Sequence, residues 1–446
     1  MSSPSPTTTA PAPAIADLDP AKIRRRLEDV RRRTLDLVLP LDWPTLRRQQ
    51  IPILSPMAWD LGHIGSFEEL WLVQRLGGRP PLADGYEEMF DPVRNPRPTR
   101  EKLPLPDLAE LTGYWQRVRE AALEVFGRGE GEAALRAGGL VYEMVAEHEE
   151  QHQETLLQAM QVLESPPYRP PVRRTPPPAR PVDDEEMVWV AGGPCELGFA
   201  GPGFAYDNER QRHEATVGDF SIDRFPVSNR RYLAFVEDDG YRRRELWSEA
   251  GWAFCEEERL AAPRTWKSED GVWTVRHFDR REPLVPEEPV VHLCWHEAEA
   301  FCRWAGRRLP SEAEWEKAAL WDQEAGRARR YPWGEEPPTP GVANVDQLAF
   351  GPAPLGTYPA GASPYGLEQV IGDVWEWTAS SLAAYPGFVA FPYVEYSEIF
   401  FGTDYKVLRG GSWATRPAVA RGTYRNWDYP IRRQIFAGFR CVLDAS

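Results

Sequence analysis

Cysteine and histidine are scarce in this 446-residue chain, which has five of the former and seven of the latter. No two cysteines form a Cys-x-x-Cys pair, so the sequence argues against a disulfide scaffold and against a zinc ribbon. Reduced thiols are typical of the cytoplasm, and we expect a soluble cytoplasmic protein. The cysteines are Cys195, Cys255, Cys294, Cys302 and Cys441.

Long hydrophobic runs, an excess of positive charge and nucleotide-binding motifs are also missing. No apolar stretch approaches the roughly 18–20 residues that cross a membrane. The 52 basic residues against 68 acidic ones give a net charge of −16, which argues against nucleic acid or an anionic membrane as a partner. Neither a Gly-x-Gly-x-x-Gly run nor a P-loop occurs, which argues against a nucleotide cofactor.

The chain divides into regions of different texture, and its length favours two domains, with three as the alternative. The start, MSSPSPTTTAPAPAIADLDP, lacks the basic and apolar parts of a signal peptide, so we predict a disordered tail over residues 1–19. The proline-rich stretch SPPYRPPVRRTPPPARP begins at residue 165 and predicts a semi-extended linker over residues 165–182.

Residues 20–164 have the pattern of a helical domain. Apolar residues recur at three- and four-residue intervals in four segments, which favours a four-helix bundle. The loop over residues 77–106, between the second and third segments, has a length typical of functional or disordered loops. The four segments cover residues 21–38, 58–76, 108–126 and 139–164.

Residues 183–446 have a different composition, with short alternating runs punctuated by glycine, proline and many of the 18 tryptophans. We expect two helices here, in SNRRYLAFVEDDG (228–240) and CWHEAEAFCRWAG (294–306), with short strands and loops elsewhere. The pattern predicts an α+β domain held together by aromatic packing.

Three histidines in the helical region point to a metal site. His148 and His152, in EHEEQHQETLL, are four residues apart and therefore share one helix face. His63 lies on another segment with apolar neighbours, where a charged imidazole would be costly. These are the helical region's only histidines, and together they predict a facial ligand set on two bundle helices.

The spacing alone leaves the identity of the metal open. Three neutral imidazole nitrogens suit zinc, iron or copper. The order His-Glu-Glu-Gln-His is not the His-Glu-x-x-His of zinc peptidases, but it contains Glu149, so peptidase chemistry is not excluded by spacing.

The last third of the chain contains the motifs WAGRRLPSEAEWEKAAL, GDVWEWTAS, KVLRGGSWAT and RNWDYPIRRQIFAGFRC. Together they resemble the formylglycine-generating-enzyme (sulfatase-modifying factor) domain, a variant of the C-type-lectin-like fold. That family binds copper through a cysteine pair. Here the late region has only Cys441, with Cys294 and Cys302 far away in sequence, so we expect the scaffold without that copper chemistry.

The N-terminal segments SPMAWDLGHIGSFEELWL and HEEQHQETLLQAM resemble a DinB-like bundle. A DinB-like bundle, a linker and a sulfatase-modifying domain, in this order, resemble the sulfoxide synthases of ergothioneine biosynthesis, the hercynine oxygenases. YDNERQRHEATVGDF and EYSEIFFGTDYKVLRGGSWAT add to this resemblance, which covers about residues 22 to 444.

The resemblance implies a non-haem Fe(II) centre whose three histidine ligands correspond to His63, His148 and His152. It also implies a reaction in which the sulfur of a thiol is joined to C2 of the hercynine imidazole, with O2 supplying the sulfoxide oxygen. By the same resemblance Tyr393, in FPYVEYSEIFF, is the catalytic phenol.

Further substrate-binding residues follow from the resemblance. Tyr396 and Gln151 correspond to positions near hercynine. Arg97 and Arg100, in RNPRPTRE, correspond to an arginine pair that binds the carboxylates of the thiol donor. Together with Asp428, which corresponds to a partner of the donor's ammonium group, they favour γ-glutamylcysteine over cysteine.

The hercynine pocket of the family implies two more residues in RNWDYP, Asn426 and Trp427. A trimethylammonium group has no hydrogen-bond donor and is usually held by aromatic faces. Trp427, Trp413, Trp375 and Tyr396 are candidates for that role, and the sequence does not distinguish between them.

Several alternatives stay open at this point. A selenoneine synthase would attach a selenosugar to hercynine on the same scaffold, and an ovothiol-type enzyme would join the sulfur at C5. A DinB-type zinc thiol transferase would need neither oxygen nor the tyrosine. A lectin-like binding module without catalysis would have no need of an open redox metal.

Overall fold

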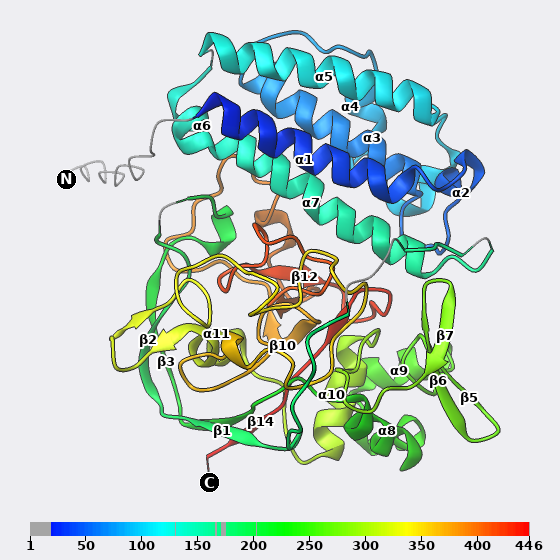
Figure 1. The fold of residues 1–446 in the computed structure, drawn as a ribbon, viewed down its shortest axis with the longest axis vertical. Helices are drawn as coiled ribbons and strands as arrows, with labels where there is room; N and C mark the ends of the chain where they lie inside the picture. Colours follow the sequence, from blue (N-terminus) through cyan, green and yellow to red (C-terminus); the bar gives the residue numbers. More distant parts are fainter. Residues whose placement is uncertain (1–18, 130, 166, 171–174, 202, 446) are drawn as a thin grey trace, which may run out of the picture.

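The computed structural model describes residues 19–129, 131–165, 167–170, 175–201 and 203–445. Within them the chain forms a helical part and a mixed α+β part that lie against each other (Figure 1). The predicted fold class is thereby confirmed. The predicted tail over residues 1–19 lies almost wholly outside the described residues, as does part of the predicted linker.

The helical part is built on four long helices close to the predicted segments. The second of them, α3, continues without interruption as a π-helix over Glu69–Arg75. Figure 1 shows α7 as the bundle helix nearest the α+β part. The helices of this part are α1 (Pro20–Val38), α2 (Trp43–Arg47), α3 (Met57–Glu68), α4 (Tyr86–Met89), α5 (Leu108–Arg128), α6 (Ala133–Arg136) and α7 (Leu140–Gln161).

Local sequence signals account for the helix ends. The side chain of Asp19 accepts a hydrogen bond from the backbone N–H of Ala21 at the start of α1, and Asp107 does the same for Glu110 at the start of α5. Helix α5 ends at Gly129, whose φ of 65° is a conformation that glycine adopts at little cost.

The 77–106 loop, expected to be functional or disordered, is ordered and includes α4 and a 3₁₀ helix over Arg97–Lys102. Among the described residues, no helix is both long enough and apolar enough to cross a lipid bilayer.

The α+β part has more helix than predicted. Helices α8 (Asn229–Glu237) and α10 (Trp295–Trp304) match the two expected segments, whereas α9 (Glu249–Glu257) and α11 (Glu312–Leu320) stand where loop was expected. Helix α11 begins with a capping box, in which Ser311 and Glu314 each bond the backbone of the other. The spacing of this serine and glutamate is the sequence pattern of a capping box and could have predicted the start of the helix.

The strands of this part form several small sheets. They are β1 (Met187–Val190), β2 (Gly193–Leu197), β3 (His213–Val217), β4 (Phe220–Asp223), β5 (Trp266–Glu269), β6 (Val272–His277), β7 (Arg280–Pro283), β8 (Trp321–Asp322), β9 (Arg327–Ala328), β10 (Trp375–Ser381), β11 (Lys406–Arg409), β12 (Asn426–Asp428), β13 (Ala437–Gly438) and β14 (Val442–Asp444). One sheet has the order β12-β11-β10-β13 and another the order β1-β4-β14. The β11–β12 pairing places Trp427 opposite Val407 and Asp428 opposite Lys406.

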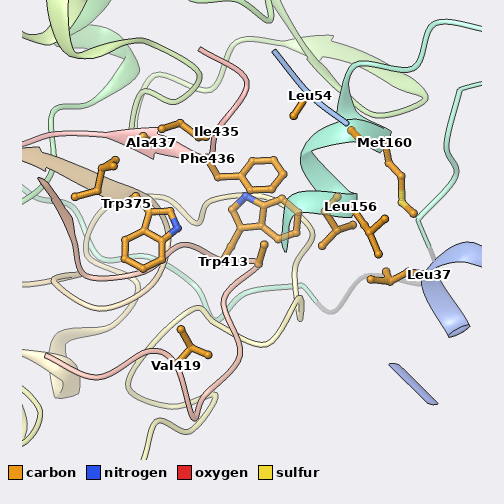
Figure 2. Packing of buried hydrophobic residues seen from close by; sticks show 14 of the residues in the cluster. Leu37, Leu54, Leu156, Met160, Trp375, Trp413, Val419, Ile435, Phe436 and Ala437 are labelled. Carbon is orange, nitrogen blue, oxygen red and sulfur yellow. The ribbon is translucent and has the colours of Figure 1, made fainter. Parts of the chain in front are cut away.

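A hydrophobic core joins the two parts. One cluster of buried side chains runs from the bundle helices into the α+β part. Figure 2 shows Leu156 of α7 beside Trp413, whose ring centroid lies 4.6 Å from that of Phe436. Burial of these apolar side chains from both parts favours their association.

Buried ion pairs and hydrogen bonds reinforce that junction. Arg421 donates to both carboxylate oxygens of Glu147 on α7, at 2.9 Å each, and to Glu209 at 2.8 Å. The carboxylate of Glu154, also on α7, accepts hydrogen bonds from Trp375 at 2.7 Å and Thr415 at 2.7 Å. Both acids of α7 are buried and each is matched by donors from the other part.

Candidate active site

The three histidines of the helical part converge on one point. Their ligand atoms all lie within 4.8 Å of one another, and within the described residues they form the one such cluster of three or more side chains with metal-binding atoms. The ring of His63 lies 5.0 Å from that of His148 and 5.0 Å from that of His152. Helix α3 supplies the first and α7 the other two, one turn apart.

Hydrogen bonding selects one nitrogen of His63 for a ligand. Its Nδ1 lies 2.8 Å from the carbonyl oxygen of Phe90. A carbonyl only accepts, so Nδ1 carries the hydrogen and Nε2 keeps the lone pair. The buried Nδ1 atoms of His148 and His152 have no hydrogen-bond partner among the described residues.

Burial keeps all three imidazoles neutral at physiological pH. It lowers the pKa of His63 to about 4, against the opposing effect of the Phe90 carbonyl. The pKa values of His148 and His152 are also held well below the usual range, first by burial and then by neighbouring histidines. Neutral nitrogens in a shared pocket are the donor set of a transition-metal ion, so the residues fit the metal that the sequence predicts.

A large cavity of about 1320 Å³ surrounds the histidines and is lined from both parts of the chain. Of the residues that the sequence nominated for the metal, the catalytic phenol and the two substrates, all lie in its wall except Trp413. These residues are His63, Arg97, Arg100, His148, Gln151, His152, Trp375, Tyr393, Tyr396, Asn426, Trp427 and Asp428.

Aromatic side chains connect Tyr393 to the helices that carry the three histidines. Its ring lies 5.1 Å from Trp71 and 6.0 Å from Phe67, and Phe67 is stacked on His148 at 3.7 Å. Burial raises the pKa of the Tyr393 phenol, so the hydroxyl holds its proton at neutral pH. The arrangement places a protonated phenol in the wall of the cavity that contains the histidines.

Tyr396 and Gln151 meet at a shared neighbour, Tyr206. The ring of Tyr396 stacks on that of Tyr206 at 4.0 Å, and Gln151 Nε2 donates to the Tyr206 hydroxyl at 2.6 Å. The hydroxyls of Tyr396 and Tyr424 lie 3.5 Å apart. Gln151 therefore lines the cavity while its amide nitrogen is bonded to Tyr206, which is not among the lining residues.

The two nominated arginines differ in environment. Arg100 is buried, stacks over Trp59 at 3.5 Å and donates to Ser55 at 2.6 Å. Burial lowers its pKa to about 10. Arg97 is exposed, and its guanidinium makes no hydrogen bond or ion pair to any other described residue. Arg97 thus has more donors available to a ligand than Arg100 has.

Strand β12 supplies three of the nominated residues. Asp428 accepts a hydrogen bond from Arg432 Nε at 2.8 Å, so its charge is already matched within the chain. Asn426 accepts from the backbone of Trp427, and the Trp427 ring lies edge-on to Tyr396 at 5.6 Å.

Of the four aromatic residues considered for holding a quaternary ammonium group, three line the cavity. Trp375, Trp427 and Tyr396 line the cavity. Trp413 does not: it packs against Phe436 in the core, as Figure 2 shows. Trp413 was therefore a wrong candidate, because its size and neighbours suit the junction between the two parts.

Several cavity residues escaped the sequence analysis. Phe67 follows His63 by four residues, so their shared helix face was a usable signal. Asp60 lies with one carboxylate oxygen 3.7 Å from His152 Nδ1, and its burial raises its pKa to about 6. Arg432 also donates a hydrogen bond to the carbonyl of Ile53 at 2.6 Å, and no local sequence pattern predicts this contact.

The cysteines lie outside this cavity in the part of the chain that the structure describes. All are buried, and the sulfur atoms of Cys302 and Cys441 lie 3.5 Å apart. Their separation in the sequence did not reveal this contact. Neither Cys302 nor Cys441 lies in the wall of the cavity that surrounds the histidine cluster.

Comparison with known protein families divides the chain in the same way as its structure. Residues 26–156 match the DinB superfamily, and residues 173–445 match the sulfatase-modifying factor enzyme 1-like domain.

Three relatives are similar over nearly the whole chain, and each is a hercynine oxygenase. The protein from Mycolicibacterium thermoresistibile is 46% identical, covering 96% of this chain and 95% of its own length. That from Mycobacterium tuberculosis is 45% identical, covering 95% and 99%. That from Mycolicibacterium smegmatis is 44% identical, covering 93% and 96%. With a helical DinB-like part, a sulfatase-modifying part and this degree of identity, the chain is an enzyme that belongs to the hercynine oxygenase family.

Proposed function

We propose that the chain catalyses an Fe(II)- and O2-dependent reaction that joins a thiol to C2 of the hercynine imidazole and forms a sulfoxide, a step of ergothioneine biosynthesis. The observation that carries the proposal is the cluster of three neutral imidazoles in a cavity whose wall also contains the nominated tyrosine and arginines. The near-full-length similarity to hercynine oxygenases supports the same reading.

The overall reaction balances without an added reductant. The C2–H and S–H bonds break, a C–S bond forms, one oxygen atom of O2 becomes the sulfoxide oxygen and the other leaves as water. The two substrates supply all the electrons that O2 takes up, which agrees with the lack of a nucleotide-binding motif in the sequence.

His63, His148 and His152 would hold the iron through their nitrogen lone pairs. When bound there, Fe(II) supplies open positions for O2 and the thiol sulfur and lowers the pKa of that thiol. The apolar side chains of Phe67, Trp71 and Phe90 in the wall near the histidines would limit the access of bulk water to those positions.

Tyr393 serves as the proton donor in this proposal. Because burial raises its pKa, the phenol keeps its proton at Oη until a more basic atom is formed nearby. The contacts with Phe67 and Trp71 orient the ring toward the metal-binding helices. Loss of the hydroxyl would leave the thiol open to oxidation without coupling to hercynine.

The rest of the wall suits two substrates of different chemistry. Trp427, Tyr396 and Trp375 offer aromatic faces to the trimethylammonium group of hercynine. Arg97 offers a guanidinium to a carboxylate of the donor, for which γ-glutamylcysteine is the favoured identity. Asp428 would bind the donor's ammonium group while sharing its charge with Arg432.

The direct test is anaerobic reconstitution with Fe(II), followed by hercynine, O2 and a panel of donors. The panel contains γ-glutamylcysteine, cysteine and a selenosugar, and products are identified by mass spectrometry with O2 uptake recorded. We expect a C2-linked sulfoxide with γ-glutamylcysteine. Zn(II)-loaded protein is the control and should form none. Product formation without O2 uptake, or equal activity with zinc, would contradict the proposal.

A further inference from the structure

The turn formed by residues 206–209 contacts both the metal-binding helix and the segment that carries Tyr393. It consists of Tyr206 and a short 3₁₀ helix, Asp207–Glu209, and all of its side chains are buried. The mechanism proposed above assigns it no role. Buried polar groups cost free energy unless they are bonded, so the partners of these side chains reveal what the turn holds together.

On one side the turn is bonded to α7. The Tyr206 hydroxyl accepts a hydrogen bond from Gln151, which lies in sequence between the two histidines of that helix. Glu209 pairs with Arg421 at 2.5 and 2.8 Å, and Arg421 in turn pairs with Glu147 of α7. The turn therefore has a rigid, buried connection to the helix that supplies two of the three imidazoles.

On the other side the turn is bonded to residues 391–397. One carboxylate oxygen of Asp207 accepts a hydrogen bond from Ser397 Oγ at 2.6 Å, and the other accepts from the backbone N–H of Phe391 at 3.3 Å. These two bonds lie on either side of Tyr393 in the sequence. The ring of Tyr206 also stacks on Tyr396.

Apart from the ring contacts of Tyr393 and Tyr396, the apolar side chains of this segment are poorly buried. Phe391 and Val394 are 41% and 46% exposed, so their apolar surface contributes little packing. Ser397 and Asp207 are 0% and 4% exposed, so the hydrogen bond between them is buried. A charge-assisted hydrogen bond of this kind is among the stronger ties that a segment can have to its support.

We propose that Asp207 is a positioning residue, which through Ser397 and Phe391 sets the place of the Tyr393 phenol relative to the histidine cluster. The inference rests on the proposed role of Tyr393. It accounts for a buried acid that touches neither the cavity nor a basic side chain, and whose carboxylate is directed at both ends of one segment.

The test uses Ser397→Ala, which removes one bond to Asp207 with little change of volume. Ser363→Ala is the matched control, since Ser363 is also a buried serine that donates to a neighbouring oxygen, here the Ala318 carbonyl at 2.8 Å. Asp207→Asn is a second variant that keeps one acceptor oxygen. Tyr393→Phe is included as the reference for loss of the phenol.

The first readout is a crystal structure of each Fe(II)-loaded, full-length variant. We expect the Tyr393 ring to leave its contacts with Phe67 and Trp71 in Ser397→Ala and to keep them in Ser363→Ala. The second readout is the ratio of sulfoxide to oxidised thiol. A displacement of about 1 Å in a reacting group lowers rates up to about 100-fold, so sulfoxide formation should fall by about 10- to 100-fold in Ser397→Ala.

The outcomes separate the inference from the function on which it rests. If Tyr393→Phe changes the product ratio but Ser397→Ala and Asp207→Asn leave both the ring position and the ratio unchanged, the positioning role is wrong and the role of Tyr393 stands. If Tyr393→Phe leaves the ratio unchanged, the phenol is not the donor, and the crystal structures alone decide whether Asp207 holds the segment. Equal effects of Ser363→Ala would overturn the inference.

Discussion

At the scale of single residues, the histidine cluster combines two properties that oppose each other in water. Burial removes the proton from each imidazole, and the same burial leaves polar nitrogens without hydrogen-bond partners. The proposed metal ion would resolve the conflict, because it would take lone pairs that water otherwise solvates. His63 adds a third property, a tautomer selected by the Phe90 carbonyl.

His148→Ala should abolish tight binding of Fe(II). Removing a group that merely orients a ligand weakens metal binding by about 10- to 100-fold, so removing a ligand should cost at least the upper end of that range. The measurement is anaerobic titration with iron content checked by elemental analysis. His213→Ala is the matched control, because the His213 ring lies 4.7 Å from that of Tyr385 and neither residue lines the cavity. Wild-type iron affinity in His148→Ala would disprove the ligand assignment.

Metal affinity should depend weakly on pH. For three histidines with the usual pKa near 6.5, proton competition between about pH 7.5 and pH 5.5 would weaken binding by about a thousandfold. The lowered pKa of His63, about 4, and the lowered values of the other two predict a much smaller change. A chelator-competition assay with Co(II) at both pH values measures it, and a thousandfold loss would contradict the burial argument.

The same shifts have a cost for the metal-free protein. When folding lowers the pKa of a histidine, the unfolded chain binds the proton at a higher pH than the folded chain does. The stability of the apoprotein should therefore fall as the pH drops through 6.5 toward the folded-state values, and bound metal should oppose this loss.

At the scale of elements, the 77–106 loop forms one wall of the cavity, and its Phe90 carbonyl orients the imidazole of His63 on α3. It presents Arg97 at the surface of the cavity and holds Arg100 against Trp59. The order of this loop follows from its contacts: the Trp59 indole donates to the Met89 carbonyl at 3.0 Å, and Gln49 donates to the Arg97 carbonyl at 3.1 Å.

Arg97→Ala should raise the KM for γ-glutamylcysteine and leave the KM for hercynine nearly unchanged. The loss of one charge-assisted hydrogen bond costs about 1.5–3 kcal/mol, or about 10- to 100-fold in KM. Steady-state kinetics with each substrate varied in turn provide the measurement. Arg94→Ala is the control, since Arg94 lies in the same loop, pairs with Glu88 and is absent from the cavity wall. Equal increases for both substrates would argue against donor binding by Arg97.

The element scale also separates what the sequence could and could not reveal. The amphipathic bundle helices were predicted to within a few residues, because one face of each is apolar. Helix α11 was missed since its residues are buried on nearly every side, Glu316 and Lys317 included, which removes the period that marks a surface helix. Its capping box was the remaining signal.

For the site, the scarcity and spacing of histidine were enough to nominate the ligand trio, and resemblance to a family supplied the rest. The remaining residues, which no sequence pattern predicted, are brought together by contacts between segments that are distant in the sequence. Ser397 and Asp207 are 190 residues apart, and Arg432 and Ile53 are 379 apart. Such pairs are created by tertiary packing, so local sequence carries no trace of them.

At the scale of the whole molecule, the site lies where the two parts of the chain meet. The bundle provides the imidazoles, and the α+β part provides the phenol and the aromatic faces. The shared hydrophobic core and the buried arginine–carboxylate pairs keep the parts in a fixed relation. We therefore expect the two parts to unfold together in a single transition.

Arg421→Ala should lower the stability of the whole enzyme while keeping that single transition. The substitution leaves the buried Glu147 and Glu209 without their cation, and removing one member of a buried pair costs about 3–5 kcal/mol. Differential scanning calorimetry gives the midpoint and the number of transitions. Arg32→Ala, in an exposed pair with Asp29, is the control and should behave as the wild type. Two separate transitions in the wild type would contradict a common core.

The 77–106 loop is a segment through which the shape of the cavity could be redesigned. The loop borders the cavity from Glu87 to Arg100 but contributes none of the three histidines proposed to bind the metal. Transplanting it from a relative would therefore reshape that side of the cavity while the helices that carry the histidines keep their own sequence. A graft would have to preserve Phe90, because its carbonyl sets the His63 tautomer and its ring occupies the space beside Gly62.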